Sequence, residues 1–129
     1  MKRDMDYVRT LLLRIEELKL PDSSQLIESD DADDFAKMVD HLKMLIEEAG
    51  YVSGCEDHVM GPKGEYWGDL RLTWTGHEYL DTIRDDEVWR NTKKGISAVG
   101  SVGVEMLMAL AKGFARKKIE DHTGITLQF

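Results

Sequence analysis

Hydrophobic residues recur at helical spacing in two segments of the first half of the chain. The first series is Met5, Val8, Leu11, Leu12, Ile15 and Leu18, and the second is Phe35, Met38, Val39, Leu42, Leu45, Ile46 and Ala49. Such spacing gathers the apolar side chains on one face of a helix. We predict helices over 4–19 and 35–49, ended by Leu20-Pro21 and by Gly50. A break near Val39-Asp40, which would give two shorter helices, is the alternative.

The spacing changes between residues 51 and 74. Residues 70–74 alternate apolar and polar, and Gly61-Pro62-Lys63-Gly64 is a turn signal, so we predict a β-hairpin. Thr75-Gly-His-Glu78 has the pattern of a capping box and predicts a helix that extends towards Asn91. Glycine and serine are frequent over 95–103, where we expect a bend or loop.

Two segments are polar or short. Over residues 22–34 we predict a polar connection with a short strand at 25–28. Over residues 125–129 we predict a short strand or a loose tail. The carboxylates of residues 28–34 lack the central glycine and the final glutamate of a calcium-binding loop. We expect them to cap a helix N-terminus instead.

The last predicted helix, over 104–118, is apolar on most of its circumference. A helix of this kind must be buried on more than one side. We favour a homodimer seam over a helix packed only within its own domain, and a membrane span is disfavoured by Glu105 and the glycines. The expected seam residues are Val104, Leu107, Met108, Leu110, Ala111 and Phe114.

The order of these elements indicates an α+β, mainly helical fold. The run from Leu45 through Ala49-Gly50-Tyr51-Val52 resembles the end of a helix entering the wing of a winged helix-turn-helix domain. This resemblance implies a winged-helix-like domain over 1–95 with a β-hairpin wing. A C-terminal helical extension over 96–129 would pack on that domain or form the dimer seam.

A longer resemblance covers most of the chain. Met1-Lys-Arg-Asp-Met-Asp6, the run from Arg71-Leu-Thr-Trp-Thr to Tyr-Leu-Asp81, Arg84-Asp-Asp86 and Trp89 are similar to an uncharacterised bacterial and phage family. The resemblance implies a compact winged-helix protein, often carried on prophages and mobile elements. It implies no catalytic residue.

The charge is unevenly distributed along the chain. The net charge of the 129 residues is −8, while residues 90–129 carry seven basic and three acidic side chains. An acidic body repels a phosphate backbone, and the basic end would dock on that body within one chain or between two. One cysteine permits no internal disulfide, and the charged N-terminal residues do not form a signal peptide, so we expect a cytoplasmic protein.

DNA binding fits the winged-helix resemblance better than it fits the chemistry. The expected reading helix, over 38–49, would expose Asp40, His41, Lys43, Met44, Glu47 and Glu48, and no arginine is available there to contact guanine. The candidate nucleic-acid contacts are Lys43, Lys63, Arg71, Lys93, Lys94, Arg116, Lys117 and Lys118. We therefore regard nucleic acid as a disfavoured partner.

Catalytic and metal sites are not indicated by the pattern. Cys55 and His58 lack the second closely spaced ligand pair of a zinc site, and His77 has no motif-defined nucleophile beside it. We expect His77 to pack near Trp74 or to hydrogen-bond at the helix start. We expect no enzyme activity, no metal and no cofactor.

Three functional hypotheses follow. The first is a non-enzymatic winged-helix adaptor or regulator, associated with mobile elements, that acts as a homodimer through contacts with a host or phage protein. The second is a DNA-binding transcriptional regulator. The third is a phage-type acidic inhibitor that occupies the nucleic-acid-binding surface of a host defence complex.

Overall fold

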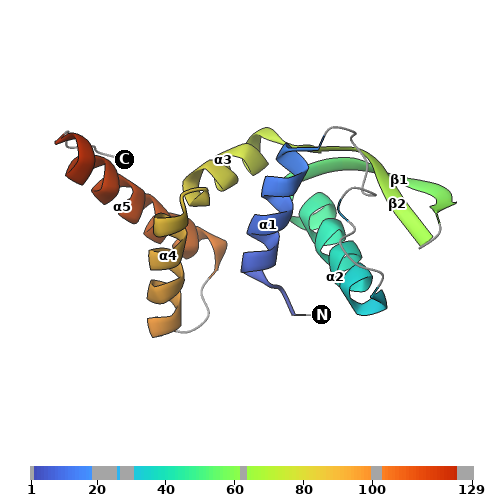
Figure 1. Cartoon of the computed structure of the whole chain (residues 1–129), viewed down its shortest axis with the longest axis horizontal. Coiled ribbons are helices and arrows are strands. Elements are labelled where there is room, and N and C mark those ends of the chain that lie inside the picture. Colours follow the sequence, from blue (N-terminus) through green and yellow to red (C-terminus); the bar gives the residue numbers. More distant parts are fainter. Residues whose placement is uncertain (1, 19–25, 27–30, 62–63, 100–102, 125–129) are drawn as a thin grey trace. The chain divides into compact units, whose positions relative to one another are not determined.

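The computed structural model describes residues 2–18, 26, 31–61, 64–99 and 103–124, with the backbone alone at 55–61, 64–67, 99 and 104. The chain divides into two compact units, Met1–Glu78 and Tyr79–Phe129. Helices predominate in the described ranges, and β1 and β2 form a two-stranded antiparallel sheet (Figure 1). The predicted mainly helical α+β class is confirmed. The division lies within helix α3, before the predicted boundary at residue 95.

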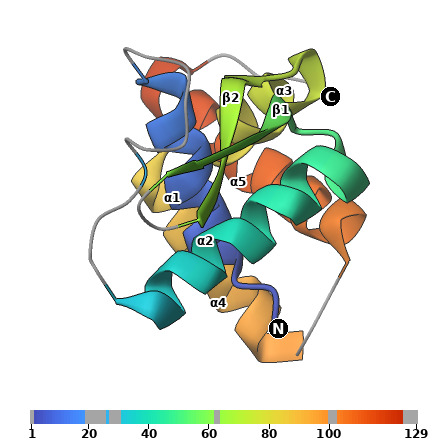
Figure 2. The ribbon, with the colours of Figure 1, turned by 90° about the vertical axis from the view of Figure 1, so that its right-hand side faces the viewer.

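Helices α1 (Met5–Glu16) and α2 (Ala32–Lys43) lie side by side in the first unit (Figures 1 and 2). The Asp4 carboxylate caps α1 by accepting a hydrogen bond from Tyr7 N, and the Asp31 carboxylate accepts from Asp33 N and Asp34 N at the start of α2. The prediction that carboxylates cap the second helix is confirmed. Val8, Leu11, Leu12 and Ile15 of α1 are buried, as their spacing predicts.

The second helical segment continues beyond α2 without a break at Val39-Asp40. From Met44 to Ala49 it widens into a short π-helical segment, η2. Gly50 then takes a left-handed conformation with φ 70°, and Tyr51 N donates to Leu45 O at 3.0 Å. The predicted stop at Gly50 is confirmed.

The predicted hairpin consists of β1 (Val52–Gly61) and β2 (Gly64–Leu72). Val52 pairs with Leu72, and both side chains are buried. The register shifts between Ser53 and Cys55, where β2 contains one residue more than β1. Asp69 lies in this bulge with φ 53°, a conformation that residues other than glycine seldom adopt.

Helix α3 (Trp74–Ile83) begins directly after β2 and enters the second unit, where α4 (Asp86–Val99) packs against α5 (Val104–Thr123). The prediction of a single helix extending towards Asn91 was wrong. Asp85 interrupts it, because its carboxylate accepts from Val88 N at 3.0 Å and caps α4 as a separate helix.

The loop predicted over 95–103 was also wrong at its beginning, because 95–99 belong to α4. Gly95 allows close helix packing, since a Cβ there would lie 2.6 Å from Leu110 Cδ2. Helix α5 extends to Thr123, beyond the predicted end at residue 118. The predicted strands at 25–28 and 125–129 lie outside the described residues, apart from Leu26.

Among the helices in the described ranges, none combines the length and the apolarity that crossing a bilayer requires.

Candidate protein-interaction surface

The start of α3 is held in place by a junction with the end of η2. Thr73 Oγ1 donates to Gly50 O at 2.6 Å and accepts from Gly76 N at 3.0 Å, while Thr73 N donates to Tyr51 O. Thr73 therefore caps α3, and the predicted capping box beginning at Thr75 was wrong by two residues. A Cβ on Gly76 would overlap the Tyr51 carbonyl oxygen, so only glycine allows this close approach.

Trp74, the first residue of α3, is the most exposed large hydrophobic residue in the part of the chain that the structure describes. Its exposed fraction is 80%. The indole is nevertheless oriented, because Nε1 donates to Glu78 Oε1 at 2.8 Å, one turn along the same helix. An exposed indole that a hydrogen bond holds in one orientation is a common anchor in protein interfaces.

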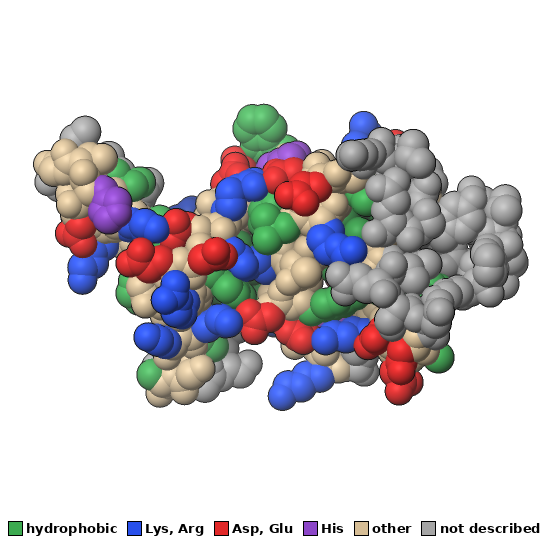
Figure 3. Space-filling view, in the orientation of Figure 1, with side chains coloured by type: hydrophobic (Ala, Val, Ile, Leu, Met, Phe, Trp, Pro, Cys, Tyr) green, Lys and Arg blue, Asp and Glu red, His purple; other side chains and the backbone are tan. Residues whose placement is uncertain are grey.

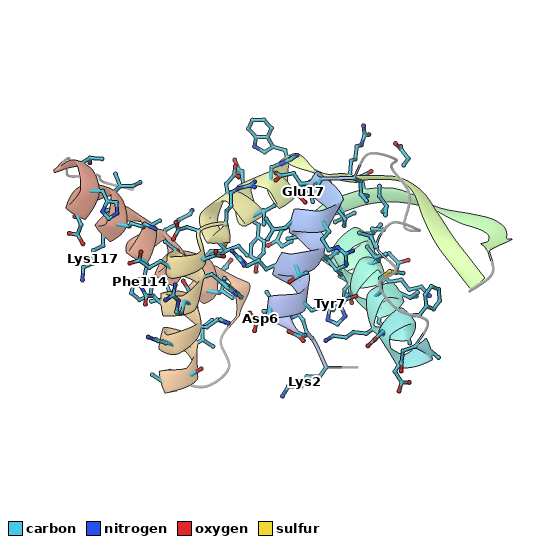
Figure 4. The ribbon with its side chains drawn as sticks, viewed as in Figure 1. Lys2, Asp6, Tyr7, Glu17, Phe114 and Lys117 are labelled. Atoms are coloured by element: carbon cyan, nitrogen blue, oxygen red, sulfur yellow. The ribbon has the colours of Figure 1, made fainter. Side chains whose placement is uncertain are left out.

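Acidic groups surround the start of α3. Glu16, at the end of α1, places Oε2 3.6 Å from His77 Nδ1, and the His77 side chain is half exposed. Glu17 follows at the end of α1 (Figure 4). Figure 3 shows acidic side chains, a histidine and a basic side chain near a protruding hydrophobic side chain above this part of α1 and α3. We call Glu16, Trp74, His77 and Glu78 the Trp74 surface.

His77 makes a contact that the sequence did not predict. Its Nδ1 lies 3.6 Å from Glu16 Oε2, at the end of α1. The contact carries charge only when His77 is protonated. His77 therefore contributes an exposed polar group to the Trp74 surface.

His41, in the helix that was expected to read DNA, is not exposed as predicted. This residue is fully buried, although the sequence analysis placed it among the exposed side chains. Asp4 N donates to Nε2 at 3.2 Å, so Nδ1 carries the proton and donates to Lys37 O at 2.8 Å. His41 therefore joins α2 to the start of α1 and is not available to read bases. Met44 is half-buried rather than exposed.

Lys37, Asp4 and Tyr7 complete this contact between the helices. Lys37 Nζ lies 2.9 Å from Asp4 Oδ2 and 4.6 Å from the centre of the Tyr7 ring, and the Tyr7 and His41 rings pack in a T-shaped arrangement. The hydrogen bond from Lys37, together with that from Tyr7 N, holds the pKa of Asp4 below its usual value. Tyr7 is labelled at the start of α1 in Figure 4.

The candidate nucleic-acid contacts fall in different environments. Lys43 and Arg71 are exposed in the first unit; in the second, Lys93, Lys94 and Lys117 are exposed and Arg116 is half-buried. Lys63 lies outside the described residues. Lys118 is already paired, with Nζ 2.7 Å from Asp85 Oδ2 and 3.3 Å from Glu87 Oε2.

The candidate seam residues of α5 are divided between two faces. Leu107 and Ala111 are buried within the single chain, where α5 packs on α4. Met108, Leu110 and Phe114 are half-buried, and the Val104 side chain is not described. Met106, which the sequence analysis did not include, is 64% exposed, and Ala109 is exposed one turn away. The spacing of Met106, Ala109 and Gly113 could have identified this stripe.

The described residues give no positive indication of a metal centre. Within them, no three histidine, cysteine, aspartate or glutamate side chains form a group that could hold an ion. The side chains of Cys55 and His58, which the sequence analysis weighed as ligands, are not among those described.

Comparison with known proteins places the chain in a family. Residues 2–103 match the family described as "Hypothetical protein (DUF2513)". The chain belongs to this family. An uncharacterized protein of Haemophilus influenzae is 32% identical over 98 residues, which cover 76% of this chain and 80% of the relative. No solved structure matches the chain. The expectation that the chain belongs to an uncharacterised family is confirmed.

The matched range includes the elements that form the Trp74 surface. It extends from the start of α1 through α3 and α4 and ends before α5. The α5 helix with its exposed stripe therefore lies beyond the part of the chain that defines the family match.

Proposed function

We propose that this member of the family is a non-enzymatic adaptor or regulator of the winged-helix type that acts through contacts with other proteins. The observation that carries the proposal is the exposed Trp74 indole, held by Glu78 at the start of α3. Exposing an indole to water is unfavourable, and burying it against a partner removes much apolar area from solvent. Truncation of a buried interface tryptophan often costs about 2 kcal/mol or more of binding free energy.

The winged-helix assignment is supported by the order of the first unit. Helices α1 and α2 are followed by η2, a turn at Gly50 and the β1–β2 hairpin, and α3 then begins without a connecting loop. This order agrees with the resemblance of the run ending at Val52 to the entry into a wing. The assignment remains part of the proposal.

The proposal favours protein over DNA as the partner. The first unit carries eighteen acidic and nine basic side chains, and that excess opposes phosphate. Burial of His41 and the pairing of Lys118 remove two polar groups from the surface available to DNA.

We also propose that the protein is a homodimer through α5. Exposed Met106 and Ala109 and half-buried Gly113 form an apolar stripe, and the small residues at two of its positions allow close approach by a second helix. Leu107 and Ala111, which were expected in the seam, are covered by the chain itself. The proposed seam therefore lies on the opposite side of α5.

Affinity purification from the native host, with and without nuclease treatment, tests the proposed function. We expect the retained proteins to be unaffected by nuclease, since they bind the protein directly. Loss of all retained material on nuclease treatment would instead support the DNA-binding hypothesis.

A further inference from the structure

The exposed face of α5 carries charged side chains beside its apolar positions. Met106 and Ala109 are exposed near the centre of this face, and Glu105 and Lys112 are exposed along one edge of it. The two charged residues are seven positions apart, which brings them to nearly the same side of a helix with about 3.6 residues per turn. One edge of the exposed face therefore carries an acidic and then a basic side chain.

Both charges are available to a partner. In the part of the chain that the structure describes, neither Glu105 nor Lys112 makes an ion pair or a side-chain hydrogen bond. They point away from the side of α5 on which Leu107 and Ala111 are buried. An exposed helix face with apolar residues at its centre and charges along its edge is typical of a helix–helix seam.

A second copy matches both charges when its α5 runs in the opposite direction. In an antiparallel pair the same edge of each helix meets across the seam, and the two-fold axis repeats every contact. Met106 of each copy then lies over the small Ala109 side chain of the other. In the same register, Glu105 of each copy lies beside Lys112 of the other. One symmetric arrangement therefore buries the apolar positions and forms two ion pairs.

A parallel pair would bring opposite edges of the two helices together. Each residue on the edge of Glu105 would then face the residue about five positions further along the second copy. Lys112 would face Lys117, which is exposed and is labelled on α5 in Figure 4. Glu105 would face Leu110, which carries no charge. The parallel pair opposes like charges where the antiparallel pair joins unlike ones, so the charges favour the antiparallel orientation.

We propose that the α5 helices of two copies pair antiparallel, with Glu105 of each copy bound to Lys112 of the other. This inference rests on the homodimer that forms part of the proposed function, and it specifies how the two copies meet. A second copy is the occupant because the two complementary charges lie on one edge of one helix, as a two-fold contact of a surface with itself requires.

Charge reversal at the two positions tests the orientation by sedimentation or light scattering of the full chain. Glu105→Lys and Lys112→Glu each place like charges together twice in an antiparallel seam. We expect each variant to self-associate about three- to tenfold more weakly at about 50 mM salt, and the difference to shrink as salt is raised. In a parallel seam, Lys112→Glu would instead strengthen self-association, because the introduced carboxylate would face Lys117.

An equimolar mixture of the two variants provides the rescue. In the mixed dimer each introduced charge faces an opposite charge, so both ion pairs are restored with their signs arranged differently. We expect the mixture to associate about as strongly as the wild type. Lys43→Glu is the control, because it makes the same change in net charge at an exposed position of α2, in the other unit. Its self-association is expected to change by less than about twofold.

Two outcomes would overturn the inference while leaving the dimer in place. One is unchanged or stronger self-association of Lys112→Glu, and the other is a mixture that associates no better than the single variants, each with a dimer that Met106→Glu still dissociates. A wild-type chain that stays monomeric at high micromolar concentration would contradict the dimer, and this inference with it. The partners of the Trp74 surface are tested separately by Trp74→Ala.

Discussion

Gly76 shows how one residue fixes the position of the candidate surface. It brings the first turn of α3 against the carbonyl of Tyr51, while Thr73 bonds to Gly50 on one side and caps α3 on the other. Because the chain leaves β2 at Leu72 and enters a helix at Trp74, no loop separates the buried strand from the exposed indole. The direction of Trp74 therefore depends on this junction.

The first prediction concerns Gly76→Ala. The added methyl group overlaps the Tyr51 carbonyl, whose carbon would lie 2.8 Å away, and backbone atoms cannot move aside as a flexible side chain can. We expect a loss of about 2–3 kcal/mol in the free energy of unfolding, measured by urea denaturation. Gly68→Ala is the control, because nothing lies within 4 Å of its added Cβ. Equal stability of the two variants would contradict the close approach.

Individual residues also show where prediction from the sequence succeeds and fails. The spacing of Val8, Leu11, Leu12 and Ile15 predicted their burial, because periodicity records which helix face is apolar. His41 was assigned to the surface by residue type, although it lies three residues after Met38 and four before Leu45 on the buried face. In the sequence, Trp74 continues the apolar alternation of Leu70 and Leu72. It is exposed because the chain changes from strand to helix at Trp74, and the alternation does not predict this change.

At the scale of elements, the contact of α5 with the start of α4 depends on charge. Lys118 hydrogen-bonds Asp85, the residue that caps α4, and also approaches Glu87. The bond from Lys118 lowers the pKa of Asp85, and the bond to Asp85 raises the pKa of Lys118. The helix boundary at Asp85 was missed from the sequence because a cap and its long-range partner leave no periodic signal.

This pair predicts a pH dependence. A carboxyl with a lowered pKa stabilises the fold above its ordinary pKa of 3.8, and this contribution is lost as the pH falls through its lower value in the folded protein. The raised pKa of Lys118 means that its contribution is lost as the pH rises through its higher folded value. We expect Asp85→Asn, which can still cap α4, to lower the melting temperature slightly near neutral pH and not at all in strong acid. Thermal melts at both pH values check this, and an equal difference at each would contradict it.

The exposed stripe of α5 predicts the effect of Met106→Glu. Leu107→Asp would bury a charge within the α4–α5 packing and could not separate dissociation from unfolding, because Leu107 is only 3% exposed. Met106 is 64% exposed, so glutamate is tolerated in a free chain and is costly only in a seam. We expect self-association to weaken by about a hundredfold or more by light scattering, with unchanged circular dichroism.

Ile119→Glu supplies the matched comparison for this dimer test. Ile119 is also exposed and lies on another face of α5, so its substitution should leave self-association unchanged. A wild-type protein that is monomeric at high micromolar concentration would contradict the proposed dimer.

For the whole molecule, the distribution of charge bears on the choice of partner. The net charge of −8 arises from the first unit, because the second carries eight basic and seven acidic side chains. We expect binding to random duplex DNA to be weak or absent near physiological ionic strength, by fluorescence anisotropy. Submicromolar affinity with a steep dependence on salt would support the DNA-binding hypothesis instead.

The most direct test of the central claim compares the partners retained by three forms of the full chain in nuclease-treated host lysate. These are the wild type, Trp74→Ala, and Thr75→Ala, which alters the exposed neighbour of Trp74 on the same helix. If the protein acts through the Trp74 surface, wild type and Thr75→Ala retain the same partners. Trp74→Ala then binds them about thirtyfold more weakly, as expected for a loss of about 2 kcal/mol. Equal retention by Trp74→Ala, with circular dichroism showing all three forms folded, would contradict the account.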